Sequence, residues 1–268
     1  KEEYALYLKL KKEITNLRRE NSKELKQMKE FQKNLKTGIK RLKSNPDTKE
    51  KTIKSFEGIA KDVEEYVTYL EDQLEAHYNT AFNPREKIVG DDLNDINDIQ
   101  YGNNNVIGPD AFHGTFCAGI IGATQNNRLG INGIANNVLL MSLRAVPNGD
   151  EYDKDVALAI RYAVDNGAQV INMSFGKSYT ANKKMVDDAM LYAQSRGVLL
   201  VHAAGNDSKN IDTTDNFPTD ILMDGNKVSN LICVGASTIS TKKRIPADFS
   251  NYGNENVDIF APGLDVVS

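Results

Sequence analysis

The sequence of 268 residues predicts an α/β protein in which an antiparallel helical hairpin precedes a mostly parallel, doubly wound sheet. Two periodicities indicate this division. Residues 1–82 carry apolar side chains at the three- and four-residue spacing of long helices, whereas residues 113–268 alternate short apolar runs with amphipathic segments. Residues 83–112, which connect the two parts, are rich in the Asn, Asp, Gly and Pro that favour loops.

The first part is expected to form two long helices separated by a short break. Their apolar stripes comprise Leu10, Ile14, Leu17, Met28, Phe31, Leu35 and Leu42, and then Ile53, Phe56, Ala60, Val63, Val67, Leu70 and Leu74. Pro46 ends the first helix, because proline cannot continue the helical hydrogen bonding and restricts the residue before it. A short break folds the two helices together, stripe against stripe, as in an antiparallel coiled coil. The charged residues between the stripes indicate a solvated face, with a partner-binding role as the alternative.

The second part predicts strands that alternate with helices. The strands are expected over Val138–Leu143, Gln169–Met173, Val198–Ala203 and Leu231–Ala236, and the helices over Asp153–Asn166 and Asn182–Arg196. Asp153 is placed to cap its helix, and a glycine follows each helix. Strands that are apolar throughout are typical of a parallel sheet covered by helices on both faces. Such sheets bind ligands at the carboxyl ends of their strands.

The composition excludes several classes of function. With 33 Lys and Arg against 37 Asp and Glu, the net charge is −4, so there is no basic excess of the kind that nucleic-acid binding needs. No apolar run reaches the length of a membrane span. Cys117 and Cys233 are too few and too far apart for a disulfide framework or a zinc site, and are expected to be small packing residues.

Five short segments stand where a site would lie. They are His113-Gly114-Thr115, Asn172–Gly176, Ala203–Asn206, Phe249–Gly253 and Ala261-Pro262-Gly263. His113 begins a helix of small residues and is either a general base or a structural histidine. Asn206 either offers its side-chain N–H to a ligand or supports a turn. Cys117 would share a helix face with His113, but a thiol in a packed helix face is a poor nucleophile.

Together and in this order, the five segments resemble the motifs of the subtilisin-like serine proteases, the subtilases of peptidase family S8. His113-Gly114-Thr115 resembles the catalytic-histidine motif, Asn172–Gly176 the substrate-binding segment, and Ala203–Asn206 the oxyanion-hole segment. Phe249–Gly253 and Ala261-Pro262-Gly263 resemble the segments that precede the nucleophile. The resemblance covers about residues 110–268, and the hairpin looks like an insertion between the acid and histidine motifs.

The resemblance implies a serine endopeptidase with a Ser-His-Asp triad. His113 would be the general base, Asn206 would donate a hydrogen bond to the oxyanion, and Ser174, Phe175 and Gly176 would bind the substrate backbone. No serine lies in the Gly-Thr-Ser context of the family nucleophile, which is therefore expected beyond Ser268.

The acid is expected before Lys1. Asp91 is the local alternative, although Asp92 stands where the family has Ser or Thr. The chain alone is thus expected to be inactive.

The resemblance further implies export from the cytoplasm, peptide or protein substrates and no cofactor for the chemistry. A structural calcium ion could bind at Asn126–Ile131, whose Asn127 would join backbone carbonyls as a ligand. The hairpin is expected to contact a partner or the rim of the active site. There are two alternative hypotheses. One is that the protein is an inactive binding module with this fold, and the other is that it is a coiled-coil adaptor carried on an α/β scaffold.

Overall fold

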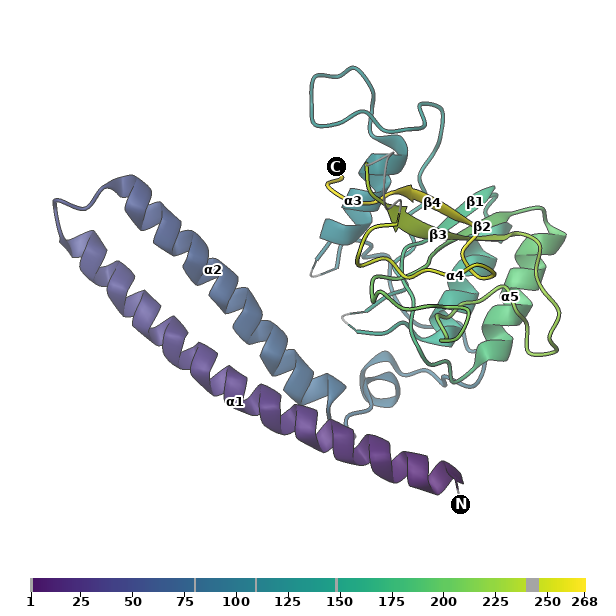
Figure 1. The fold of residues 1–268 in the computed structure, drawn as a ribbon, viewed down its shortest axis with the longest axis horizontal. Coiled ribbons are helices and arrows are strands. Elements are labelled where there is room, and N and C mark those ends of the chain that lie inside the picture. Colours follow the sequence, from purple (N-terminus) through teal and green to yellow (C-terminus); the bar gives the residue numbers. More distant parts are fainter. Residues whose placement is uncertain (1, 80, 109, 148, 240–245) are drawn as a thin grey trace. The chain divides into compact units, whose positions relative to one another are not determined.

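A computed structural model describes residues 2–79, 81–108, 110–147, 149–239 and 246–268 (Figure 1). The chain divides into two compact units, residues 1–87 and residues 88–268, each with its own set of elements. The finer division at residues 82 and 112, which rests on composition, stays a prediction.

The first unit is the predicted helical hairpin. Helix α1 spans Glu2–Ser44 and helix α2 spans Glu50–Asp72, followed by the short π-helical turns η1 (Gln73–His77) and η2 (Arg85–Val89). The break between α1 and α2 contains Pro46, as expected. Val63, Val67 and Leu70 of α2 are buried, so this part of the predicted apolar stripe packs as expected, whereas Leu17, Phe31 and Phe56 of the predicted stripes are exposed.

Three ion pairs define the antiparallel alignment of α1 and α2. Lys29, Lys36 and Lys43 of α1 pair with Glu71, Glu64 and Glu57 of α2, at 2.5, 3.5 and 2.7 Å. Each step of seven residues forward in α1 is matched by seven residues backward in α2. All six side chains are 40% exposed or more, so each pair adds little to stability.

The second unit contains a parallel sheet of four strands in the order β1-β2-β3-β4. The strands span Val170–Met173, Leu199–Ala203, Leu231–Ser237 and Ile259–Pro262. Met173 of β1 lies opposite His202 of β2, and Ser237 of β3 lies opposite Pro262 of β4. The predicted parallel α/β class is confirmed, and all four carboxyl ends lie at one edge of the sheet.

Helix α4 (Asp153–Asp165) and helix α5 (Lys183–Ser195) pack on each other and bury their apolar faces against the strands. Both helices lie below the sheet in Figure 1. The core between the helices and the strands includes Val156, Ile160, Met173, Met190 and Leu200. These two helices and β1 to β3 begin and end within one residue of their predicted bounds.

The predicted strand at Val138–Leu143 is wrong, because these residues form no regular structure. No described strand pairs with them, and a strand requires a neighbour to satisfy its backbone N–H and C=O groups. Their apolar side chains are consequently exposed, and Leu139 is fully so.

Asp153 has a different role from the predicted helix cap, because it is already the first residue of α4. Its Oδ2 accepts hydrogen bonds from the backbone N–H groups of Ala181 and Asn182, at 2.9 and 2.7 Å, and its Oδ1 lies 2.8 Å from Lys177 Nζ. These bonds hold the pKa of Asp153 below its usual value despite burial, which acts in the opposite direction. Asp153 thus fixes the chain that leads from β1 to α5.

Candidate active site

Two of the predicted site segments leave the sheet side by side. Ser174, Phe175 and Gly176 follow β1, and Asn206 follows β2 three residues after the strand ends. Because β1 and β2 are paired and parallel, both segments emerge at the same edge. The structure therefore brings the predicted substrate-binding residues and the predicted oxyanion donor to neighbouring strand ends.

A buried histidine joins these two segments. His202 of β2 is 2% exposed, and its Nε2 donates a hydrogen bond of 2.8 Å to the carbonyl oxygen of Phe175. The two rings meet edge to face with their centroids 6.5 Å apart. Burial lowers the pKa of His202 to about 4, so the imidazole is neutral at physiological pH.

The protonation of His202 predicts acid sensitivity. An unfolded chain binds a proton at this histidine near pH 6.5, whereas the folded protein resists protonation down to about pH 4. Stability should therefore fall as the pH drops through this window, by up to about 3 kcal/mol from His202 alone. Denaturant unfolding at pH 7 and at pH 4.5 measures this loss. A His202→Gln variant keeps a hydrogen-bond donor but cannot titrate, so equal losses in the two proteins would contradict the prediction.

The loop that carries Asn206 has an exposed tip and a fixed base. Asn206 itself is exposed. Gly205 has φ = +102°, a conformation that glycine tolerates and other residues rarely adopt. Asn216 Nδ2 donates to the carbonyl oxygens of Ala203 and Ala204, at 3.0 Å each. The side chain of Asn206 is therefore accessible to a ligand, while hydrogen bonds from Asn216 hold the backbone before it.

His113 lies in helix α3 (Phe112–Gly122), close to the helix start as predicted. Its side chain is exposed, and its Nε2 lies 4.0 Å from Sγ of Cys117, one turn further along. No hydrogen bond or ion pair joins His113 to Asn206 or to Ser174–Gly176 within the described part of the chain. The C-terminal segment lies against α3, because Ser268 Oγ donates a hydrogen bond to the carbonyl oxygen of Phe116 at 2.8 Å (Figure 1).

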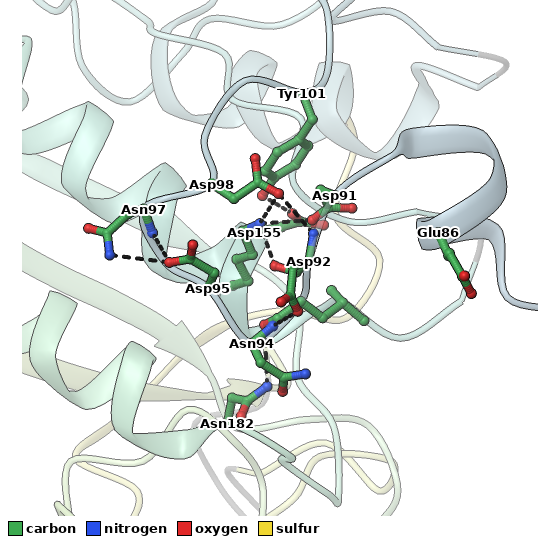
Figure 2. A network of polar contacts seen from close by, with 12 residues as sticks. Glu86, Asp91, Asp92, Asn94, Asp95, Asn97, Asp98, Tyr101, Asp155 and Asn182 are labelled. Carbon is green, nitrogen blue, oxygen red and sulfur yellow. Dashed lines mark hydrogen bonds and ion pairs between the residues drawn. The ribbon is translucent and has the colours of Figure 1, made fainter.

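Asp91, the local alternative for the catalytic acid, belongs to a buried polar network (Figure 2). Its Oδ2 lies 2.9 Å from Nζ of Lys154, and neither side chain is exposed. Lys154 Nζ also donates to the carbonyl oxygen of Asp92 at 2.7 Å and lies 4.5 Å from the centre of the Tyr101 ring. This arrangement gives Asp91 a structural partner on α4 and provides no support for a role beside His113.

The same network anchors the connector between the two halves of the chain. Tyr101 Oη donates to Asp155 at 2.5 Å, and Asp98 accepts the backbone N–H of Asp92 at 2.9 Å. Lys154 and Asp155 therefore hold the connector from the first turn of α4. Figure 2 shows Asp155 beside Tyr101. Sequence reasoning missed this anchor, because Lys154 and Asp91 stand 63 residues apart.

The two cysteines are unpaired with each other, and each is a free thiol. Cys233 is buried in β3, and burial raises the pKa of its thiol to about 12, with smaller contributions from Asp258 and Asp220. Such a thiol stays protonated and inert, which agrees with the packing role predicted for it.

The loop predicted to bind calcium is shaped by its own asparagines. Oδ1 of Asn127 accepts the backbone N–H of Leu129 at 2.9 Å, and Oδ1 of Asn132 accepts that of Asn126 at 2.8 Å. Among the described residues, no three His, Cys, Asp or Glu side chains cluster as metal ligands would. Calcium binding here stays a prediction that rests on amide and carbonyl oxygens alone.

The parallel α/β unit, with a candidate substrate-binding segment and an asparagine loop at one sheet edge, fits a known class of hydrolase. The model of the subtilase family, Peptidase S8, matches residues 35–267. The chain therefore belongs to the subtilases, a family of serine proteases.

Individual curated relatives agree with this family membership. The chain is 41% identical over 157 residues to the thermophilic serine proteinase of Bacillus sp. (strain AK1), covering 58% of this chain and 35% of that protein. It is 36% identical to thermitase of Thermoactinomyces vulgaris, covering 58% of this chain and 50% of thermitase. Among solved structures, the S41 psychrophilic protease has a TM-score of 0.47 and 31% identity, with 56% of this chain and 52% of that chain covered.

The chain thus spans half of the length of these two curated relatives or less. Two further relatives, from Bacillus subtilis and Xanthomonas campestris, are named as extracellular proteases. In the described residues, no helix is long and apolar enough to cross a membrane.

Proposed function

We propose that the full-length protein is a secreted serine endopeptidase, to which this chain contributes the general base His113 and the oxyanion donor Asn206. The observation that supports the proposal is the pairing of Met173 with His202, since the segments proposed to bind the substrate and the oxyanion follow these two paired strands. The extracellular relatives support secretion.

The proposed reaction is acyl transfer through a covalent intermediate. The serine oxygen bonds to the carbonyl carbon of the peptide while His113 takes the hydroxyl proton. The C–N bond then breaks, and His113 returns the proton to the leaving amine. Water then bonds to the acyl carbon while His113 takes a proton from it, and the C–O bond to the serine breaks as His113 returns that proton to the serine oxygen.

Asn206 would act while negative charge develops on the carbonyl oxygen. Its exposed side-chain N–H donates best to the oxyanion of the tetrahedral intermediate, so it lowers the barrier more than it strengthens substrate binding. Ser174, Phe175 and Gly176 would offer backbone groups with which the substrate pairs as an added strand. The helical hairpin is proposed to contact a partner or the active-site rim.

A fluorophosphonate, which reacts with an activated serine, tests the proposal on the full-length protein. We expect the wild type to be labelled and His113→Ala to react far more slowly, because the serine loses its base. Lys184→Ala, which changes an exposed side chain of α5, is the control and should label like the wild type. Undiminished labelling of His113→Ala would remove His113 from the mechanism. A folded wild type that is not labelled would favour the inactive binding module.

A further inference from the structure

The segment Phe249–Gly253 resembles a family motif, yet the proposed mechanism gives it no task. In the structure it runs beside the loop that carries Asn206. Ser208 N–H donates to the carbonyl oxygen of Phe249 at 2.9 Å, and Tyr252 N–H donates to that of Lys209 at 2.9 Å. The two segments are thus hydrogen-bonded together along their length.

Asn251 makes the central contacts between the two segments. Its side chain is buried, and its Oδ1 accepts the N–H groups of Asp207 and Lys209, at 3.0 and 2.9 Å. Its Nδ2 donates to the carbonyl oxygen of Ala204 at 2.8 Å. These three bonds reach the loop on both sides of Asn206, which itself stays exposed.

The backbone between these contacts is shaped to the asparagine. The N–H of Asn251 donates to the carbonyl oxygen of Gly205 at 2.8 Å. A side chain at position 205 would place its Cβ against Nδ2 of Asn251, so only glycine allows this approach. The side-chain amide of Asn251 therefore lies against the loop, where its oxygen accepts hydrogen bonds and its nitrogen donates one.

Asn251 is in turn fixed to the sheet. The neighbouring Ser250 Oγ accepts the backbone N–H of Ala236 in β3 at 2.9 Å and donates to the carbonyl oxygen of Asn251 at 2.8 Å. Both residues are 2% exposed. A hydrogen-bonded path consequently runs from β3 through Ser250 and Asn251 to the Asn206 loop.

From this geometry we infer that Asn251 is a positioning residue, which holds the loop so that Asn206 can donate to the oxyanion. The inference rests on the proposed function, since it assigns Asn251 a role in the same site. An oxyanion donor must be placed before the charge develops, and a displacement of about 1 Å can cost on the order of a hundredfold in rate. Asn251 acts through Asn206 and does not itself touch the substrate.

Kinetics of the full-length protease with a peptide substrate test this role. Asn251→Leu should lower kcat by about ten- to a hundredfold and leave KM within about twofold, because the donor acts in the transition state. Asn251→Asp keeps Oδ1 but sets a carboxylate against the carbonyl of Ala204, and serves as the second variant should leucine prevent folding. Asn256→Leu is the matched control. Asn256 Nδ2 donates to Ile211, outside the loop, so kcat should stay within about twofold.

A double substitution separates positioning from general structural support. In an Asn206→Leu background, Asn251→Leu should cause little further loss, because the donor that it positions is gone. If the two losses multiply, Asn251 does not act through Asn206 and the inference is wrong. Equal losses of kcat in Asn251→Leu and Asn256→Leu would also overturn it.

Amide hydrogen exchange tests the same contacts without any need for activity. Exchange at Asp207 and Lys209 should be faster in Asn251→Leu than in the wild type, while exchange in β1 to β3 stays unchanged. Unchanged exchange at these two amides would refute the positioning role. A wild type that neither cleaves peptides nor reacts with a fluorophosphonate would refute the proposed function, with the exchange result still deciding whether Asn251 holds the loop.

Discussion

Replacing Lys154 by methionine is expected to lower the free energy of unfolding by about 3–5 kcal/mol. The ammonium group is fully buried and lies 2.9 Å from the equally buried carboxylate of Asp91. Methionine has a similar length but no charge, so the variant removes the buried cation that offsets the lost hydration of the Asp91 carboxylate. Denaturant unfolding followed by circular dichroism measures the change.

Two further variants make this prediction specific. Lys184→Met breaks an ion pair with Asp188 in which the lysine side chain is 74% exposed, and it should change stability by no more than about 0.5 kcal/mol. The double variant Asp91→Leu/Lys154→Met should be more stable than Lys154→Met, because it also removes the carboxylate whose buried cation is lost. Equal changes in the free energy of unfolding in Lys154→Met and Lys184→Met would show that the buried pair contributes no more to stability than the exposed pair.

Replacing Asn206 by leucine is expected to lower kcat of the full-length protease by about a hundred- to a thousandfold. This magnitude was measured for the oxyanion donor of subtilisin, a member of the same family, and is carried over to Asn206. Leucine has nearly the same shape but no N–H group, so the developing oxyanion loses one hydrogen bond. KM should change little, because the bond strengthens mainly in the transition state.

Steady-state kinetics with a peptide substrate measures the loss. Asp207→Asn is the control, since the exposed side chain of Asp207 lies in the same loop and should leave kcat within about twofold. A rise in KM with unchanged kcat in Asn206→Leu would indicate that Asn206 binds the ground state and is not the oxyanion donor.

Local patterns were sufficient to predict the regular elements around the core. Helices α4 and α5 were recognised from their amphipathic spacing and from Gly167 and Gly197, which follow them. The apolar run Val138–Leu143 carries the same signal as β2, yet forms no strand, because apolar character does not tell whether a pairing neighbour exists.

The parts of the site that depend on long-range contacts could not be predicted. The resemblance located Asn206 and Ser174–Gly176, and β-pairing placed them at one edge. The contact of His202 with Phe175 and the contacts of Asn251 with the Asn206 loop join residues 27 or more positions apart. A histidine inside an otherwise apolar strand is the sequence signal that could have pointed to the first of these contacts.

The ion pairs of the hairpin also bear on how its length can vary. Lys29, Lys36 and Lys43 recur every seven residues, as do Glu57, Glu64 and Glu71. Removing seven residues from each helix beside the turn would eliminate the Lys43–Glu57 pair and leave the other two pairs intact. The hairpin can therefore shorten or lengthen in whole heptads, about 10 Å at a time, without a new set of interhelical contacts.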